Sequence, residues 1–407
     1  MDPRLARLAL ATALASIGLA AGGTGGALLA TEIAGHDGMA GVPFSLLVVG
    51  SALGAILTSW LTRRTGRRVA IAAAYLTGVA GAAVVILGDR ADALPLVLAG
   101  SFLLGPASAA VFLSRYAGAE LAPPGTPGRG LGLVLFATAL GAAAAPNLLG
   151  PAGAVATAVG LSAATGLYLC AVPAFGIAAA ILLAARRDAP AADPSGSRLP
   201  DATSGLRAGV VGGMAVLGGA NLAMVGIMAV APVHLTAHGH ELGFIGLAIS
   251  LHVGGMLGPS PLTGRLSDRF GPTPLAVASA GALLAAGALA AAVDHRDPLP
   301  AAGALLVLGL GWNLAIVAGS TMLVAGRTES ERPSAEAAGE VTMGAAAAIG
   351  ATTGSLLAWI GGWPTMTLAV GLGGGLLVAA GAGHGWARRR FGPPSGSPVL
   401  SAADADR

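Results

Sequence analysis

Apolar runs of about twenty residues follow one another along most of the chain, and short connections between them hold most of the charged residues. A run of this length is what an α-helix needs to cross about 30 Å of hydrocarbon. The pattern predicts an all-α polytopic membrane protein with twelve transmembrane helices. They lie near residues 8–30, 43–62, 68–88, 94–114, 129–150, 160–184, 208–233, 242–263, 273–293, 299–324, 338–360 and 364–386.

Composition supports a chain embedded in lipid. Hydrophobic residues make up 55% of the sequence and charged residues 10%, whereas a soluble domain carries about 25% charged residues. A soluble protein this apolar would expose large apolar patches, but a bilayer solvates the outer faces of the helices. The 65 glycines suit close packing between membrane helices. We therefore expect the lipid bilayer to surround the protein.

The arginines fall almost entirely in alternate connections, and the chain contains no lysine. Basic residues concentrate in the cytoplasmic connections of membrane proteins. The distribution therefore predicts that both termini are cytoplasmic in a multi-pass protein of the inner cell membrane, which requires an even number of helices. The cytoplasmic connections hold Arg63 to Arg68, Arg115 with Arg129, and Arg265 with Arg269, among others, and the opposite connections hold Arg90 and Arg296.

Several other classes of partner are disfavoured. The pI near 9.7 comes without a basic patch interleaved with aromatic residues, so we expect no nucleic acid partner. The single cysteine, Cys170, excludes a cysteine metal cluster, and His234, His238 and His240 are spaced too loosely to favour a metal site. We expect no metal and no cofactor.

A polar stretch, residues 185–207, divides the chain into two parts. The predicted domains are a bundle of six helices over 1–184, a cytoplasmic linker over 185–207, a second bundle of six helices over 208–390 and a disordered cytoplasmic tail over 391–407. Segments 59–66 and 264–271, which lie 205 residues apart, both place a Leu, an Arg and a Gly in register between two helices. Parallel repeats of this kind are a recurrent transporter design, so we expect two pseudo-symmetric halves.

Segment 264–271 contains Gly264, Arg265, Asp268, Arg269 and Gly271 in the order G-x-L-x-D-R-x-G. In these residues the sequence resembles the major facilitator superfamily, and helix number, linker position and repeat offset agree with that resemblance along the whole chain. The resemblance implies alternating access by a rocker-switch motion. The first half departs from the family pattern, because Arg63 stands where the family has Asp, and Ser101 stands where helix 4 usually carries a buried Arg.

Segment 141–150, with Pro146, Asn147 and Gly150, is similar to the helix-5 pattern of the exporters in that family, although Ala145 replaces a glycine. Prolines next to glycine bend helices and free a carbonyl. Gly105-Pro106 and Gly258-Pro259 are therefore hinge candidates, together with Pro146 and Gly150. Static kinks are the alternative interpretation.

Few polar groups lie at the depth where a transporter binds its substrate. His252 is the one clearly ionisable group there, and it is interpreted either as a proton carrier or substrate contact, or as a packed histidine bonded to a carbonyl. Amides at this depth either bond substrate or join helices. The further candidates for the cavity are Asn221, Asn313, Trp312, Asn147, Met224 and Met228, the methionines being flexible enough for a hydrophobic guest.

The connections suggest a latch between the halves. Asp268 is expected to cap the helix that begins at Gly128-Arg129, because a carboxylate is stabilised at a helix N-terminus. In the other half, Arg63 is expected to face Glu336 or Glu340. The alternative is that these charges only set topology.

The leading interpretation is a monomeric secondary transporter that exports a hydrophobic or amphiphilic small molecule by proton antiport, like the drug/proton antiporters of the family. It rests on the helix-5 pattern and on an interior nearly free of charge, and no deeply buried arginine is expected that would bind an anion. The alternative is uptake of a neutral metabolite by proton symport. Outside transport, an integral-membrane enzyme would need a nucleophile, a base or a metal site that the sequence does not offer, and a receptor is the remaining option.

Overall fold

A computed structural model of the 407-residue chain describes every residue except 1, 37–38, 40, 185–207, 293–296 and 392–407. The predicted linker 185–207 and nearly all of the predicted tail 391–407 lie outside the described residues. The regular elements of the described part are helices, and the predicted apolar spans overlap with them. The all-α interpretation is therefore confirmed for the part of the chain that the structure describes.

The first half runs from the N-terminus to residue 183. Its elements are α1 (Pro3–Ala20), a π-helical segment (Ala21–Gly25), α2 (Gly26–Ala34), α3 (Val42–Thr65), α4 (Arg67–Arg90), α5 (Leu94–Leu121), α6 (Pro127–Ala158), a short 3₁₀ turn (Ala163–Thr165) and α7 (Gly166–Leu183). The predicted first span therefore corresponds to α1, the π-helical segment and α2 together.

The second half begins after the linker. Its elements are α8 (Ala208–Met228), α9 (Ala231–Ala237), α10 (Leu242–Leu257), α11 (Ser260–Phe270), α12 (Pro272–Ala292), α13 (Pro298–Val324) and α14 (Arg332–Phe391). Ten helical stretches of the described chain are long and apolar enough to cross a membrane. Twelve crossings and the side on which the termini lie stay predictions.

The α14 helix covers two predicted spans because the chain reverses inside it. Gly362 has φ +73°, a left-handed value that favours glycine, and Pro364 follows it. The arm before Gly362 packs against α8 with Gly354 on Gly226, and the arm after it packs with Gly381 on Gly212, at the other end of α8. The two arms therefore run in opposite directions along one helix.

The predicted boundaries were too short at the two related segments. The sequence analysis placed 59–66 and 264–271 between helices, but α3 continues to Thr65 and α11 to Phe270. Each helix ends at a glycine with positive φ, Gly66 (+88°) and Gly271 (+80°). Charged residues near a helix end are solvated without breaking the helix, and a left-handed glycine is what stops it.

The two halves repeat with the predicted offset. Gly66 and Gly271 are 205 residues apart, and so are Pro127 and Arg332, the first residues of α6 and α14. One apolar cluster lies within the first half, and a second includes the core of the second half together with buried residues of α5 and α6. The second cluster therefore joins the halves.

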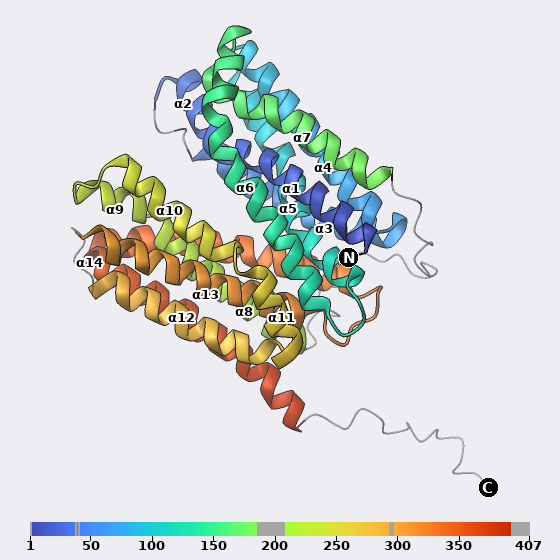
Figure 1. Ribbon diagram of the computed structural model, residues 1–407. Coiled ribbons are helices and arrows are strands. Elements are labelled where there is room, and N and C mark those ends of the chain that lie inside the picture. The colour runs from blue at the N-terminus through green and yellow to red at the C-terminus, as the bar shows by residue number, and fades with distance from the viewer. Residues whose placement is uncertain (1, 37–38, 40, 185–207, 293–296, 392–407) are drawn as a thin grey trace.

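We call one end of the molecule the arginine-rich end. There α3, α5, α11 and α13 finish and α4, α6, α12 and α14 begin. Figure 1 shows the two halves side by side near this end, whereas α2 and α9 lie far apart at the opposite end. The contacts between the halves described below gather at the arginine-rich end.

Candidate functional site: a polar interface between the halves

Glycines bring the backbones of the two halves together at the arginine-rich end. A Cβ on Gly264 of α11 would overlap the carbonyl of Gly128 on α6, and a Cβ on Gly132 would overlap the carbonyl of Ser260. Such approaches are open only to residues without a side chain. Gly264, which the sequence singled out, therefore acts as a contact surface between α6 and α11.

Asp268 caps the N-terminus of α6. Its two carboxylate oxygens accept hydrogen bonds from the backbone N–H groups of Gly128 at 2.7 Å and Arg129 at 2.9 Å. The predicted contact is therefore present, and it uses the peptide dipoles and free N–H groups of a helix start. The side chains of Arg129, Arg265 and Arg269 are exposed instead of joining this contact.

Arg63 contacts α14 as predicted, but the predicted partner, Glu336 or Glu340, is wrong. Arg63 Nη1 donates to Ser59 on its own helix at 3.0 Å and to Ser334 in the first turn of α14 at 2.9 Å. Subtracting the repeat offset from Asp268 and Ser334 gives Arg63 and Arg129, so the two contacts are related by the pseudo-symmetry. Glu336 and Glu340 lie further along α14 and meet other arginines.

Arg67 holds Glu336. Its Nη1 lies 2.6 Å from Glu336, and its Nε and Nη2 lie 2.8 and 2.7 Å from Glu120 on α5. The Glu336 side chain is 2% exposed, so this carboxylate depends on a cation of the opposite half. Planar guanidinium forks bind two carboxylates in this way.

Arg115 holds Glu340. Arg115 is the largest fully buried side chain among the described residues, with 0% exposure. Arg115 Nη2 lies 2.6 Å from a carboxylate oxygen of Glu340. Its Nε donates to Ser320 Oγ at 2.8 Å, its Nη1 donates to the carbonyl of Phe112 at 2.7 Å, and its Nη2 also donates to Tyr116 Oη at 3.0 Å. The contacts tie α5 to both α13 and α14.

This buried arginine corrects the sequence analysis, which assigned Arg115 to a solvated connection and expected no deeply buried arginine. The predicted helix stopped at residue 114 because a charge follows, but α5 continues to Leu121. A signal was present in the sequence: Arg115 is flanked by apolar and small residues on both sides, with Tyr116 beside it. A lone charge within such a run indicates a buried partner.

His252 lies on α10 and is 2% exposed. Its Nδ1 is 2.8 Å from the carbonyl of Leu305 on α13. A carbonyl only accepts, so Nδ1 carries the hydrogen and Nε2 is left as an acceptor. Within the described residues Nε2 has no hydrogen-bond partner. Both predicted interpretations stay open, because one nitrogen is bonded to a carbonyl and the other is free to take a proton.

Asn221 joins three helices of the second half. Its Nδ2 donates to the carbonyl of Met343 at 2.9 Å, and its Oδ1 accepts from the indole N–H of Trp312 at 2.7 Å. Both functional groups of the amide are therefore occupied by protein. The hydrogen bonds favour the joining role over the substrate role for Asn221 and Trp312 in this conformation.

Asn313 is likewise occupied. Its Oδ1 accepts from Thr263 at 2.6 Å, and its Nδ2 donates to the carbonyl of Met256 and to Ser260 at 2.7 and 2.8 Å. These contacts span the break between α10 and α11 and fix both pieces to α13. Met224 and Met228 are half-buried and pack against the core of the second half. The side chain of Asn147 lies outside the described residues.

One hinge candidate coincides with a break in a helix. Gly258 and Pro259 separate α10 from α11, and the predicted span over 242–263 is thus two helices. Gly105 and Pro106, by contrast, lie inside the unbroken α5, where a Cβ on Gly105 would overlap the backbone of Gly50. That pair serves close packing of α3 on α5. The side chain of Pro146 lies outside the described residues, and Gly150 lies within α6 with open space around it.

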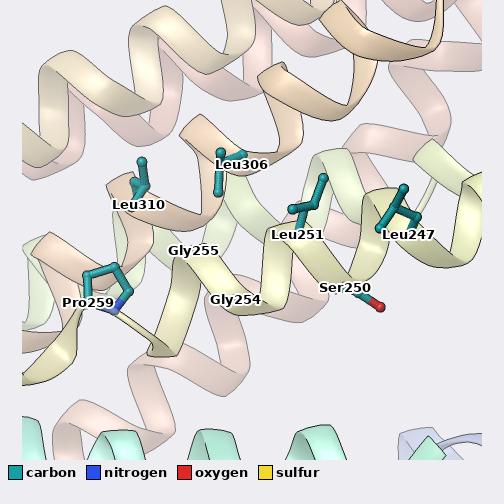
Figure 2. Close-up of a pocket in the computed structure, with 8 residues that line it drawn as sticks. All are labelled: Leu247, Ser250, Leu251, Gly254, Gly255, Pro259, Leu306 and Leu310. Atoms are coloured by element: carbon teal, nitrogen blue, oxygen red, sulfur yellow. The ribbon is translucent and has the colours of Figure 1, made fainter.

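A groove of about 300 Å³ lies between α10 and α13, close to the break at Pro259. Figure 2 shows its lining, which is Leu247, Ser250, Leu251, Pro259, Leu306 and Leu310, with two glycines. The Ser250 hydroxyl already donates to the carbonyl of Gly246 at 2.8 Å. The groove offers no other polar side chain, so we place the candidate site at the polar interface.

The interface has the properties of a gate. Each half has buried apolar side chains of its own and one apolar cluster spans both halves, while Asp268, Glu336 and Glu340 bind groups of the opposite half. When the interface opens, the buried ion pairs of Glu336 and Glu340 exchange their protein partners for water. The arrangement can close one end of the molecule and release it without unfolding either half.

Comparisons with known proteins agree with this architecture. The sequence model of the Major Facilitator Superfamily matches residues 8–325. The chain is 35% identical over 354 residues to the uncharacterized MFS-type transporter YddS of Bacillus subtilis, covering 84% of this chain and 80% of that protein. It is 28% identical over 349 residues to the riboflavin transporter RfnT of Brucella anthropi, covering 84% and 85%. In fold it is similar to a bacterial homologue of the iron transporter ferroportin in an outward-facing state, with a TM-score of 0.74, 15% identity and coverage of 93% and 98%.

Proposed function

Because this chain belongs to the Major Facilitator Superfamily, we propose that it exports a hydrophobic or amphiphilic small molecule by proton antiport, using a rocker-switch motion of its two halves. The polar interface is the gate at the arginine-rich end, and that end faces the cytoplasm. Alternating access then requires that the contacts of Arg67, Arg115 and Asp268 break in each cycle.

The observation that carries this proposal is the position of the charges. The ion pairs of Arg67 and Arg115 lie at one end of the bundle, and the polar side chains assigned to mid-depth are His252, Asn221 and Asn313, which are uncharged in the form that is cheap to bury. A middle region of this kind suits an apolar guest better than a sugar acid or a free phosphate. The charged residues of the gate pair with each other, and the polar side chains assigned to mid-depth carry no charge in their neutral form.

His252 is the coupling group in this proposal. Its Nε2 is buried and has no partner within the described residues, and an imidazole nitrogen of this kind can take up and give back a proton. Gly258-Pro259 follows His252 by six residues in the same predicted span. Protonation of His252 can therefore affect the break between α10 and α11. Proton uptake at Nε2 and binding of substrate are then mutually exclusive, as antiport requires.

A second candidate is uptake of a neutral metabolite by proton symport. The relative that favours it is the riboflavin transporter RfnT, which matches this chain over 84% of its length. The same gate serves both directions, because a rocker-switch is reversible and the gradients decide the direction.

Flux into energised inverted membrane vesicles tests the proposal. A panel of hydrophobic dyes, amphiphilic antibiotics and riboflavin is offered, and accumulation is measured with and without a protonophore. Accumulation of a dye or antibiotic that the protonophore abolishes supports export by antiport. Accumulation of riboflavin in right-side-out vesicles alone supports the second candidate, and flux of no compound above that of empty vesicles contradicts both.

A further inference from the structure

Arg115 is held from two sides that belong to different halves. Its own helix supplies the carbonyl of Phe112 to Nη1 and the hydroxyl of Tyr116 to Nη2, and the Tyr116 ring lies 4.4 Å from the guanidinium carbon. The opposite half supplies Ser320 to Nε and Glu340 to Nη2. The contacts with Phe112 and Tyr116 stay with the arginine whether the halves are together or apart, so its orientation is fixed in advance.

The groups that leave on opening occupy one edge of the guanidinium. Nε and Nη2 form a pair of parallel N–H donors, which is the geometry that matches the two oxygens of a carboxylate. In the closed state Nε donates to the Ser320 hydroxyl, and one oxygen of Glu340 lies 2.6 Å from Nη2 as its ion-pair partner. When α13 and α14 move away from α5, Ser320 and Glu340 vacate this edge, while Nη1 remains on the Phe112 carbonyl and Nη2 keeps its contact with Tyr116 Oη.

Arg67 and Arg115 differ in whether a carboxylate of their own half binds them. Arg67 has a carboxylate in its own half, because Glu120 binds it at 2.7 and 2.8 Å. Within the described residues the ion pair of Arg115 is with Glu340 of the opposite half. Opening therefore leaves Arg67 paired and Arg115 without a counter-ion, and a cation that has lost its partner in an apolar surrounding strongly favours a new anion.

The surroundings of Arg115 are apolar. Leu113, Leu131 and Leu135 of the first half and Leu217 and Leu323 of the second belong to the same buried cluster as Tyr116. Opening exposes these side chains next to the vacated edge. A ligand that gains from both features has a hydrophobic body and an anionic group.

We propose that the Nε–Nη2 edge of Arg115 is a binding site for the carboxylate of an amphiphilic ligand when the halves part at the arginine-rich end, in place of Ser320 and Glu340. The inference rests on the alternating access of the proposed function, and it narrows the substrate class to amphiphilic acids. It also reverses the expectation that no buried arginine is present to bind an anion. Glu340 and the ligand take turns at one guanidinium, so binding favours the open gate.

The test uses the purified protein in lipid nanodiscs, which leave both ends accessible. Dansyl-labelled undecanoic acid is the probe, and its methyl ester is the matched uncharged probe. The readout is the ratio of the two dissociation constants, which cancels any change in the open population that affects both probes alike. Charge-assisted hydrogen bonds to the vacated edge predict that the acid binds about tenfold more tightly than the ester, or more.

Arg115→Gln is expected to bring the ratio close to one while ester binding persists, and Arg115→Lys, which keeps the charge but not the fork, is expected to lower it severalfold. Arg67→Gln is the matched control: it also weakens the gate, but Arg115 is intact, so the preference for the acid persists. Retention of the preference in Arg115→Gln, or its equal loss in Arg67→Gln, overturns the proposal.

Glu340→Gln gives an independent answer if Arg115→Gln does not fold. Removing the competing carboxylate is expected to tighten acid binding severalfold and to keep the preference over the ester. Unchanged acid binding contradicts the inference. The two proposals fail in different experiments. Flux that a protonophore abolishes, without any preference for the acid over the ester in binding, refutes this inference alone. Absence of flux for every compound of the panel refutes the proposed function.

Discussion

Arg115 and Ser320 occupy equivalent positions of the two repeats, 205 residues apart, and contact each other directly: Arg115 Nε donates to Ser320 Oγ at 2.8 Å. The pseudo-symmetry thus brings α5 and α13 together at matching points, and the two halves differ in what they place there. The first half contributes a cation and the second a hydroxyl, with Glu340 one helix away. The asymmetry in charge adds an ion pair to an interface that also contains apolar side chains of both halves.

Charge reversal tests which residues pair. Arg67→Glu places a carboxylate against both Glu120 and Glu336 and is expected to abolish most flux, since breaking a buried pair costs about 3–5 kcal/mol. Glu336→Arg in the same chain is expected to restore part of it, because the exchanged pair is again attractive. The measurement is initial flux in vesicles normalised to the amount of protein.

The matched control for this exchange is Arg63→Glu with Glu340→Arg. Arg63 contacts Ser334 and not Glu340, and Glu340→Arg would set two guanidinium groups against each other at Arg115. We expect no restoration in that pair of changes. If flux is restored in that variant and not in the variant with Arg67 and Glu336 exchanged, the pairing described here is wrong and Arg63 pairs with Glu340 in the membrane.

Asp268→Ala is expected to favour the open gate. The change removes two hydrogen bonds between a carboxylate and the first N–H groups of α6, which contribute about 1–3 kcal/mol in total to the closed state. Spin labels at Pro124→Cys and Glu329→Cys, in a Cys170→Ala background, report the distance between the halves at this end. The distance distribution is expected to shift towards larger values.

Asp297→Ala is the control for that experiment. Asp297 also bonds the backbone N–H of a helix start, that of Leu299 on α13, but donor and acceptor lie in the same half. The change therefore removes a helix cap without touching the interface, and the distance distribution should stay as in the parent protein. An equal shift in both variants would mean that general loss of helix stability, and not the latch, moves the halves.

His252→Asn separates the two interpretations of the histidine. The asparagine amide keeps a donor for the Leu305 carbonyl, but it cannot take up a proton between pH 5 and 8. If His252 couples protons, flux continues at a reduced rate and loses its pH dependence across that range. His384→Asn, at an exposed position on α14, should keep the parent profile. An unchanged profile in His252→Asn identifies a packed histidine.

Asn221→Leu is expected to destabilise the second half without changing affinity for the transported molecule. The change leaves the buried Trp312 indole N–H without its partner and removes the hydrogen bond to the Met343 carbonyl, at a cost of about 1–3 kcal/mol for a buried polar group. The measurement is the thermal transition in nanodiscs beside KM of flux. Adding Trp312→Phe removes the unpaired donor and should recover part of the stability, whereas a large rise in KM would assign Asn221 to the substrate.

The helical character and approximate placement of the apolar spans, the 205-residue repeat offset and the capping contact of Asp268 followed from the sequence. Each depends on a local or periodic property: the length of an apolar run, the spacing of charges, and a short motif repeated at a constant offset. The ends of α3 and α11 were misplaced because a charged residue does not stop a helix, whereas the left-handed glycines Gly66 and Gly271 do.

The partners within the interface were decided by the tertiary structure alone. Arg63, Arg67 and Arg115 are chemically alike in the sequence, and only the packing of α3, α4 and α5 against α14 sends one to Ser334, one to Glu336 and one to Glu340. Burial is a property of what surrounds a side chain, so the same arginine is solvated at a helix end or fully enclosed, depending on whether another half of the molecule covers it. That covering is set by contacts distant in sequence, which no local pattern encodes.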